Sequence, residues 1–141
     1  MERDKYFLGI AELISKRSTC VRRSVGAVIV KDNRIVSTGY NGTPKGLKHC
    51  TVEDCIRNIQ KIPSGTRHEL CKGVHAEMNA VVFANRYDLE GADIYVTVFP
   101  CVFCMKVIIN SGIKRIIYSG NYDDELSKEI VGQTDIVCWK I

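Results

Sequence analysis

The sequence predicts an α/β protein, built as a three-layer α/β/α sandwich around a mixed sheet of about five strands. Two β-branched runs near the N-terminus favour paired strands, and helical and strand patterns then alternate from residue 75 onward. The chain has 141 residues, of which 45% are hydrophobic and 26% charged. We therefore expect a single domain over residues 1–141 with a substantial core.

The first twenty residues predict an amphipathic helix with Phe7, Ile10, Ala11 and Ile14 on one face. Acidic residues interrupt this segment, which excludes a secretory signal peptide, and no apolar run in the chain approaches membrane-spanning length. We expect a cytoplasmic protein with no membrane partner, or one in the host cytoplasm if the source is viral.

The β-branched runs "SVGAVIV" and "RIVSTGY" flank Asp32 and Asn33 and predict a β-hairpin. Residues 41–74 show little periodicity beyond a short helix near residues 52–60, and so long an irregular segment is uncommon in a compact domain. The remaining patterns predict helices at 75–86, 101–111 and 123–132, and strands at 92–99, 113–120 and 135–141. Gly112 is expected to end the second of these helices.

Two short motifs, "HAE" and "PCVFC", stand where helices are expected to begin. His75 offers a nitrogen ligand, and Cys101 and Cys104 are spaced so that two thiolates from one helical turn can hold one metal ion. One nitrogen and two sulfurs suit tetrahedral Zn²⁺, and three protein ligands leave a fourth position for water, which is typical of catalytic zinc. Bound zinc lowers the pKa of water to about 7.

Glu77 is predicted to act beside the metal without ligating it, as the general acid and base that moves protons from water to substrate. Each motif alone is weak, because a lone His is more often structural and a lone C-x-x-C is often a redox pair or half of a structural zinc site. Both motifs in this order are the pattern of zinc-dependent nucleobase deaminases. The sequence therefore predicts a hydrolytic deaminase.

The chain resembles the deoxycytidylate (dCMP) deaminases of the cytidine deaminase-like superfamily. The resemblance covers nearly the whole chain and rests on "VGAVIVKDNRIVSTGYNGTPKGLKHC", "IPSGTRHELCKGVHAEMNAV", "YVTVFPCVFCMKVIINSGIKRIIY" and "NYDD". It implies the cytidine deaminase-like fold, and conversion of dCMP to dUMP and ammonia, which supplies dUMP for thymidylate synthesis. A few relatives also accept dCTP, and nothing in the sequence excludes a bifunctional dCMP/dCTP deaminase.

The resemblance also implies substrate contacts. The backbone N–H of Ala76 would hold the base carbonyl, Asn41 would bind the deoxyribose, and Gly42 in the "GYNG" turn would line the nucleotide, although a plain turn after the hairpin explains that motif equally well. Tyr118 or Tyr122 could stack on the pyrimidine, while Tyr118 fits a core position equally well. Lys and Arg are usually surface residues; the basic candidates for the 5′-phosphate are Lys45, Arg22 and Arg23.

Seven cysteines need an explanation other than disulfides in a cytoplasmic protein, and metal binding is the leading one. The family resemblance implies a second, structural zinc held by Cys20, Cys50 and His68. Cys71 is the expected fourth ligand, with Cys55 as the alternative. Such a closed site would hold the irregular segment in place. The other interpretation is that these cysteines are reduced and buried as small hydrophobic residues.

Many dCMP deaminases are homohexamers that dCTP activates and dTTP inhibits, so the resemblance implies the same assembly and effectors here, with Mg²⁺ accompanying a bound nucleotide effector. Arg86 matches a family position near the subunit interface. Its alternative role is a charge at a helix end that favours the helix dipole.

Two other functions compete with this prediction. One is deamination of another nucleobase, such as adenosine in tRNA, but the net charge of +4 has no clustered basic stripe, so we expect no nucleic-acid partner. The other is a zinc-stapled binding or DNA-uptake accessory module without catalysis. Glu77 distinguishes them, because a purely structural zinc site has no use for a carboxylate beside an open ligand position.

Overall fold

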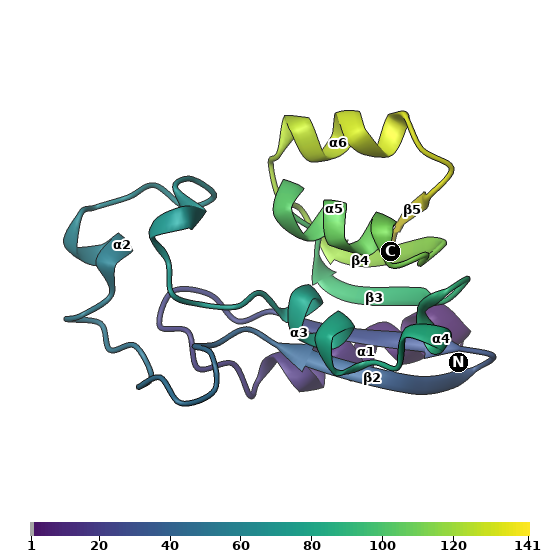
Figure 1. Ribbon diagram of the computed structural model, residues 1–141, viewed down its shortest axis with the longest axis horizontal. Coiled ribbons are helices and arrows are strands. Elements are labelled where there is room, and N and C mark those ends of the chain that lie inside the picture. The colour runs from purple at the N-terminus through teal and green to yellow at the C-terminus, as the bar shows by residue number, and fades with distance from the viewer. Residues whose placement is uncertain (1) are drawn as a thin grey trace.

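A mixed sheet in the order β2-β1-β3-β4-β5 runs through the computed structural model, which describes residues 2–141 (Figure 1). β1 pairs antiparallel with both β2 and β3, whereas β3, β4 and β5 are parallel to one another. The strands are β1 (Gly26–Lys31), β2 (Arg34–Tyr40), β3 (Asp93–Val98), β4 (Arg115–Gly120) and β5 (Val137–Lys140). The five-stranded mixed sheet predicted from the sequence is confirmed.

Helices cover both faces of this sheet, as predicted. The side chains of β1 alternate: Ala27 and Ile29 face one apolar cluster, and Val28 and Val30 face the other. The first cluster is covered by α3, α5 and α6, and the second by α1. These helices are α1 (Arg3–Ser15), α3 (Ala76–Phe83), α5 (Val102–Asn110) and α6 (Glu125–Gly132).

The amphipathic N-terminal helix is confirmed as α1. Phe7 and Ala11 are buried, as is Leu8, and Ile10 and Ile14 pack at the margin of the same cluster. The predicted hairpin between β1 and β2 is confirmed too. Its two turn residues both have left-handed backbones, with φ of 50° and 62°, as a tight type I′ turn requires.

The helix predicted over residues 75–86 is wrong only in its last three residues. α3 ends at Phe83, and a separate turn, α4 (Arg86–Leu89), follows. The side chain of Asn85 accepts a hydrogen bond from the Tyr87 N–H and so caps this new helix. An asparagine at this position favours starting a helix over continuing one.

The segment 41–74 is closed at its base. Gly42 and Val74 exchange two backbone hydrogen bonds, of 3.2 and 2.7 Å, so the ends of the segment lie side by side. Between them the chain forms only α2 (Ile56–Ile59), shorter than expected, and a 3₁₀ turn, η1 (His68–Leu70). Figure 1 shows this segment extending away from the sheet. No helix within residues 2–141 has the length and apolar character needed to cross a membrane.

Candidate active site and metal centre

Two helices begin at the same place beside the sheet and carry the predicted metal ligands. His75 is the residue before α3, and Cys101 is the residue before α5, whose first turn contains Cys104. Neither His75 nor Cys101 caps its helix with a side-chain hydrogen bond. Their side chains are therefore free for another partner, and each lies at a helix N-terminus that stabilises thiolates.

Glycine at position 39 of β2 lets α3 approach this closely. A Cβ atom there would overlap the Ala76 carbonyl oxygen and the Ala80 backbone nitrogen. The close packing of α3 on β2 places His75 at the sheet edge, opposite the N-terminus of α5.

The three ligand atoms lie where one zinc ion can bind them all. His75 Nδ1 is 3.4 Å from Cys101 Sγ and 3.3 Å from Cys104 Sγ. The three atoms lie within 4.8 Å of one another, and this is the only such set of potential ligands in the described chain. Tetrahedral zinc separates a nitrogen and a sulfur ligand by about 3.6 Å. The residues fit zinc, with only three protein ligands.

Glu77 lies beside this set and is 4% exposed. Its Oε2 atom is 3.5 Å from Cys104 Sγ. Burial raises the pKa of Glu77 above its usual value. A carboxyl group that holds a proton more readily than usual is suited to accept and return one near neutral pH.

The thiols share protons with their neighbours. Hydrogen bonds from Cys104 and from His75 hold the pKa of Cys101 well below its usual value, despite its burial. The same pairing with Cys101, together with burial and the nearby Glu77 carboxylate, raises the pKa of Cys104. Metal binding would release such thiol protons, because zinc ligands must be deprotonated.

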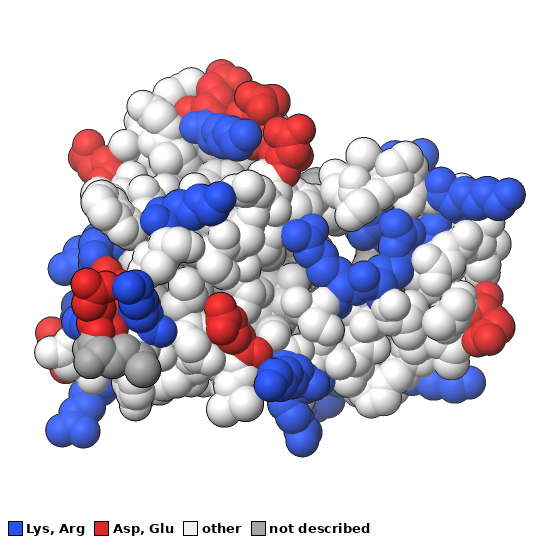
Figure 2. Space-filling model, turned by 180° about the vertical axis from the view of Figure 1, so that it is seen from behind, with Lys and Arg blue, Asp and Glu red and all other residues white. Residues whose placement is uncertain are grey.

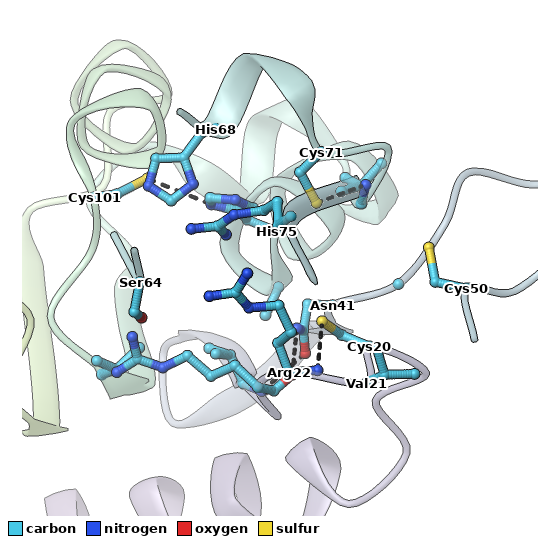
Figure 3. Close-up of a pocket in the computed structure, with 18 of the residues that line it drawn as sticks. Cys20, Val21, Arg22, Asn41, Cys50, Ser64, His68, Cys71, His75 and Cys101 are labelled. Carbon is cyan, nitrogen blue, oxygen red and sulfur yellow. Dashed lines mark hydrogen bonds between the residues drawn. The ribbon is translucent and has the colours of Figure 1, made fainter. Parts of the chain in front are cut away.

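A cavity of about 240 Å³ opens onto His75, Cys101 and Glu77. Figure 3 shows His68, His75 and Cys101 on one side of it, facing Arg22, Asn41 and Cys20. Val25, Val98 and Phe99 add an apolar wall. The cavity therefore combines a metal site, a buried acid, an apolar surface and several polar groups.

The sequence places this site in a family. Residues 1–120 match the family described as the cytidine and deoxycytidylate deaminase zinc-binding region. The chain belongs to this deaminase family.

Individual family members are similar over most of the chain. The deoxycytidylate deaminase of Mycobacterium phage D29 is 44% identical over 120 residues, covering 82% of this chain and 92% of the phage protein. ComE operon protein 2 of Bacillus subtilis (strain 168) is 40% identical over 121 residues, which cover 84% of this chain but only 60% of that protein.

The fold agrees with a solved structure of the same kind. The dCMP deaminase of cyanophage S-TIM5, in complex with dCMP and dUMP, superposes with a TM-score of 0.78 at 29% sequence identity. The match covers 97% of this chain and 95% of the cyanophage chain. The predicted cytidine deaminase-like fold is confirmed.

The predicted substrate residues Ala76, Gly42 and Asn41 all line the cavity of this family member. Ala76 is the first residue of α3, so its N–H has no acceptor within the helix. The Asn41 side chain accepts from the Val25 N–H and donates to the Arg23 carbonyl oxygen, each at 2.8 Å. These bonds hold the chain before β1 against the end of β2, a positioning role that the sequence did not indicate.

The two tyrosines differ. Tyr122 lines the cavity, and its hydroxyl lies 2.6 Å from His68 Nε2. Tyr118 does not line the cavity but packs edge-on against Phe99, at 5.2 Å between ring centroids, beside the core, as in the alternative core position considered for it. Neighbouring strand residues face opposite sides, so Tyr118 lies on the face of the sheet opposite to Ile117, in the apolar cluster that α3 and α5 cover.

Only some of the basic residues considered for binding the 5′-phosphate lie at the cavity. Arg22 and Arg23 line the cavity, whereas Lys45 does not. The sequence interpretation missed Arg57, which lines it from α2, and Phe99. Phe99 directly precedes "PCVFC" and could have been inferred from that motif, but nothing around Arg57 distinguishes it from an ordinary surface arginine.

The expected ligands of a second metal do not converge in the structure. Cys20, Cys50, His68 and Cys71 all line the cavity, but they do not form a set within 4.8 Å in residues 2–141. His68 instead lies against His75, at 5.2 Å between ring centroids. Figure 3 shows Cys50 well away from His68. Burial raises the pKa of Cys50, and the nearby Cys55 and Cys71 contribute to this.

Arg86 does not end a helix. It is the first residue of α4, where a positive charge is not favoured by the helix dipole, and its guanidinium lies over the Tyr87 ring, at 5.6 Å. The dipole explanation for Arg86 is therefore wrong, and its side chain is exposed on the surface.

Proposed function

We propose that this chain hydrolyses dCMP to dUMP and ammonia. The observation that carries the proposal is Glu77, a buried carboxyl group beside three metal ligands that leave one ligand position open. Deoxycytidylate is the substrate named for the relatives, and the cavity combines basic and apolar walls that suit a nucleotide.

Different residues of the chain would bind the metal, transfer protons and hold the base. Zinc at His75, Cys101 and Cys104 would supply Lewis acidity that makes water nucleophilic at neutral pH. Glu77 takes one proton from the attacking water and delivers it to N3 of cytosine. It then takes the second proton from the hydroxyl group now on C4 and delivers it to the departing amine, so that the C4 carbonyl forms. A carbon–oxygen bond forms at C4, the carbon–nitrogen bond breaks, and ammonia leaves. The Ala76 N–H holds the base carbonyl, and Phe99 helps to exclude bulk water.

The first test is ultraviolet-monitored turnover of dCMP by zinc-loaded protein, with dCTP, deoxycytidine and CMP in parallel. We expect dCMP to have the highest kcat/KM. Comparable turnover of dCTP would establish the bifunctional alternative, and no turnover of any of the four would favour another nucleobase or a non-catalytic binding module.

We also propose a second, structural zinc held by Cys20, Cys50, His68 and Cys71, with Cys55 as the alternative to Cys71. Support comes from their shared position on the wall of one cavity. Binding would draw the segment 41–74 inward, because these side chains are not assembled beforehand. Metal analysis of purified protein should give two zinc ions per chain, and Cys50→Ser should lower this to one.

We further propose that the chain forms a homo-oligomer through α3 and α4. Val82, Phe83 and Tyr87 are 71%, 66% and 80% exposed, next to Arg86. Apolar side chains this exposed in one short stretch are typical of an interface. Light scattering of wild-type protein and of Phe83→Glu tests this proposal, and a wild-type monomer would contradict it. The hexamer, control by dCTP and dTTP, Mg²⁺ with an effector, and the cytoplasmic location stay predictions.

A further inference from the structure

The start of α6 is hydrogen-bonded to the "PCVFC" motif. Asp124 Oδ2 accepts from the Val102 N–H at 2.8 Å. The Ser127 hydroxyl donates to the Pro100 carbonyl oxygen, also at 2.8 Å. These backbone groups belong to the two peptide units that flank Cys101, so α6 holds the chain on both sides of a metal ligand. Neither Asp124 nor Ser127 lines the cavity.

The two contacts belong to one linked set of hydrogen bonds. Asp124 Oδ1 accepts from the Ser127 N–H at 3.0 Å and so caps α6. One carboxylate group thus satisfies the N-termini of two helices, with one oxygen for each. Ser127 is fully buried, and its hydroxyl would be costly to bury without the acceptor that it finds at Pro100. These shared bonds fix the start of α6 and the start of α5 relative to each other.

The acceptor for the Val102 N–H comes from a residue 22 positions along the chain. A helix leaves its first N–H groups without acceptors, and the residue before the helix usually supplies one from its own side chain. Cys101 holds that position in α5 but makes no such side-chain hydrogen bond. Because Asp124 takes over this role, the thiol of Cys101 stays available to His75, 3.4 Å away, and to a metal ion.

We propose that Asp124 and Ser127 are positioning residues for zinc, because they fix the backbone at Cys101 so that its thiolate meets the other ligands in one geometry. The peptide units on either side of Cys101 set where its sulfur can lie. Polar groups that hold metal ligands in place are worth about ten- to a hundredfold in metal affinity. This inference rests on the proposed function, since it concerns how the metal centre of that function is held.

The other charged side chains at the start of α6 are exposed to solvent and provide controls. The side chains of Asp123 and Glu125 are 90% and 85% exposed, and each lies 3.5 Å from the half-exposed Lys128. Figure 2 shows acidic side chains gathered at the top of the molecule, where α6 lies in Figure 1. Changing Asp123 or Lys128 leaves every bond to the "PCVFC" motif in place.

Zinc affinity tests the inference. Asp124→Asn leaves one acceptor oxygen for two N–H groups, and Ser127→Ala removes the bond to Pro100. We expect each variant to raise the Kd for zinc about ten- to a hundredfold in competition with a chelator. Asp123→Asn and Lys128→Gly should stay within about twofold of wild type, although Lys128→Gly weakens α6 through the low helix propensity of glycine.

Cobalt-substituted protein gives a second measurement that does not depend on turnover. Co²⁺ binds the same nitrogen and sulfur ligands as Zn²⁺, and its absorption bands report the coordination of thiolates. These bands should shift or weaken in Asp124→Asn and in Ser127→Ala and stay unchanged in the two controls. Cys104→Ser, which lacks one ligand, identifies the bands and the zinc release that belong to this site.

Two outcomes would overturn the inference. One is wild-type zinc affinity and cobalt bands in both Asp124→Asn and Ser127→Ala. The other is a loss of zinc affinity in Lys128→Gly as large as that in Ser127→Ala, which would mean that α6 only stabilises the fold. Should Asp124→Asn not fold, Ser127→Ala carries the same comparison.

The two proposals can fail separately. If wild type binds zinc in a manner that depends on Asp124 and Ser127 but does not deaminate dCMP, the deaminase proposal fails and the positioning role stands. If wild type deaminates dCMP and neither Asp124→Asn nor Ser127→Ala changes zinc affinity, the positioning role fails and the deaminase stands.

Discussion

The two ends of strand β3 carry polar clusters of opposite character. At its start, Asp93 accepts hydrogen bonds from Arg115 at 2.8 and 3.0 Å and from Arg3 at 3.1 Å. Tyr95 joins this cluster by donating to Asp4 at 2.7 Å. Just beyond the other end of β3 lies the metal cluster with Glu77, where the adjoining cavity holds cationic side chains without carboxylate partners.

This difference indicates that the cluster at the start of β3 stabilises the fold, whereas the cluster beyond its other end serves function. Every charge in the Asp93 cluster has an opposite partner within the chain, so the cluster can hold α1, β3 and β4 together and needs no ligand. The metal end keeps an acid, thiols and arginines that the chain itself does not fully satisfy. Buried polar groups without internal partners are expected where a ligand completes them.

Removing the acid of the metal end should lower turnover far more than any change in the Asp93 cluster. We expect Glu77→Gln to lower dCMP turnover by about a hundredfold to ten-thousandfold, because the amide cannot transfer the proton. Zinc content should stay at the wild-type value. Steady-state rates and metal analysis check this, with Asp93→Asn as the control at the other end of β3. Turnover within tenfold of wild type would eliminate Glu77 as the proton carrier.

Removing the metal should abolish activity without a protein change. Dialysis against a chelator should reduce turnover to background, and added Zn²⁺ should restore it, since the three ligands hold the ion that activates water. Cys104→Ser should show the same loss without rescue, whereas Cys138→Ser, in β5 and outside the cavity, should retain activity. A chelated protein that contains no zinc and remains fully active would contradict the metal site.

Breaking the Asp93 cluster at the start of β3 should lower stability and leave activity nearly unchanged, the opposite of the effects expected at the metal end. We expect Asp93→Asn to lower the free energy of unfolding by about 2 kcal/mol, because two arginines lose their buried partner, although both are partly exposed to solvent. The kcat/KM for dCMP should stay within about twofold of wild type. Urea unfolding measures the first quantity, with exposed Asp135→Asn as the control. If Asp93→Asn lost much activity but no stability, the assignment of this cluster to stability and of the metal end to function would be wrong.

The same carboxylate should make stability depend on pH. Burial acts to raise the pKa of Asp93, but hydrogen bonds and charges from Arg115 and Arg3 outweigh it and hold the pKa below its usual value. The unfolded chain therefore binds this proton more readily, so the stabilisation is present above about pH 4 and is lost as the pH falls through the folded-state pKa. Urea unfolding from pH 6 to pH 3 should show a smaller decline in Asp93→Asn than in wild type. Parallel declines would exclude Asp93 as the source.

The smallest effect is expected at Tyr95. Its hydroxyl donates to Asp4 and accepts from Arg3 at 2.8 Å, so Tyr95→Phe should lower the free energy of unfolding by about 1 kcal/mol. Activity should not change. Thermal unfolding of this variant beside Tyr6→Phe, on the exposed side of α1, checks the assignment. If Tyr95→Phe lowered the free energy of unfolding more than Asp93→Asn does, Tyr95 and not Asp93 would be the main stabilising residue of this cluster.

Local signals in the chain predicted much of this. The β-branched run "SVGAVIV" predicted the strand β1, and Asp32 and Asn33 predicted the turn that follows it. Asn85 was the missed local signal, because its capping preference ends the helix that the apolar pattern seemed to continue. Tyr118 needed the tertiary structure: its position in β4 puts it on the face of the sheet that α3 and α5 cover, but only the packing against Phe99 shows that it lies outside the cavity.

The sequence by itself determined the metal triad and its acid. The spacing within each motif and the helix start that follows it set how His75 and Glu77, or Cys101 and Cys104, present their side chains, and those are local properties. Only the tertiary structure decided what surrounds them. Arg57 enters the cavity because carbonyl groups of residues 63 and 66 hold it there, and the Cys50 side chain stands apart from His68. Such contacts form between groups of an irregular segment that has no periodicity to reveal which side chains face inward.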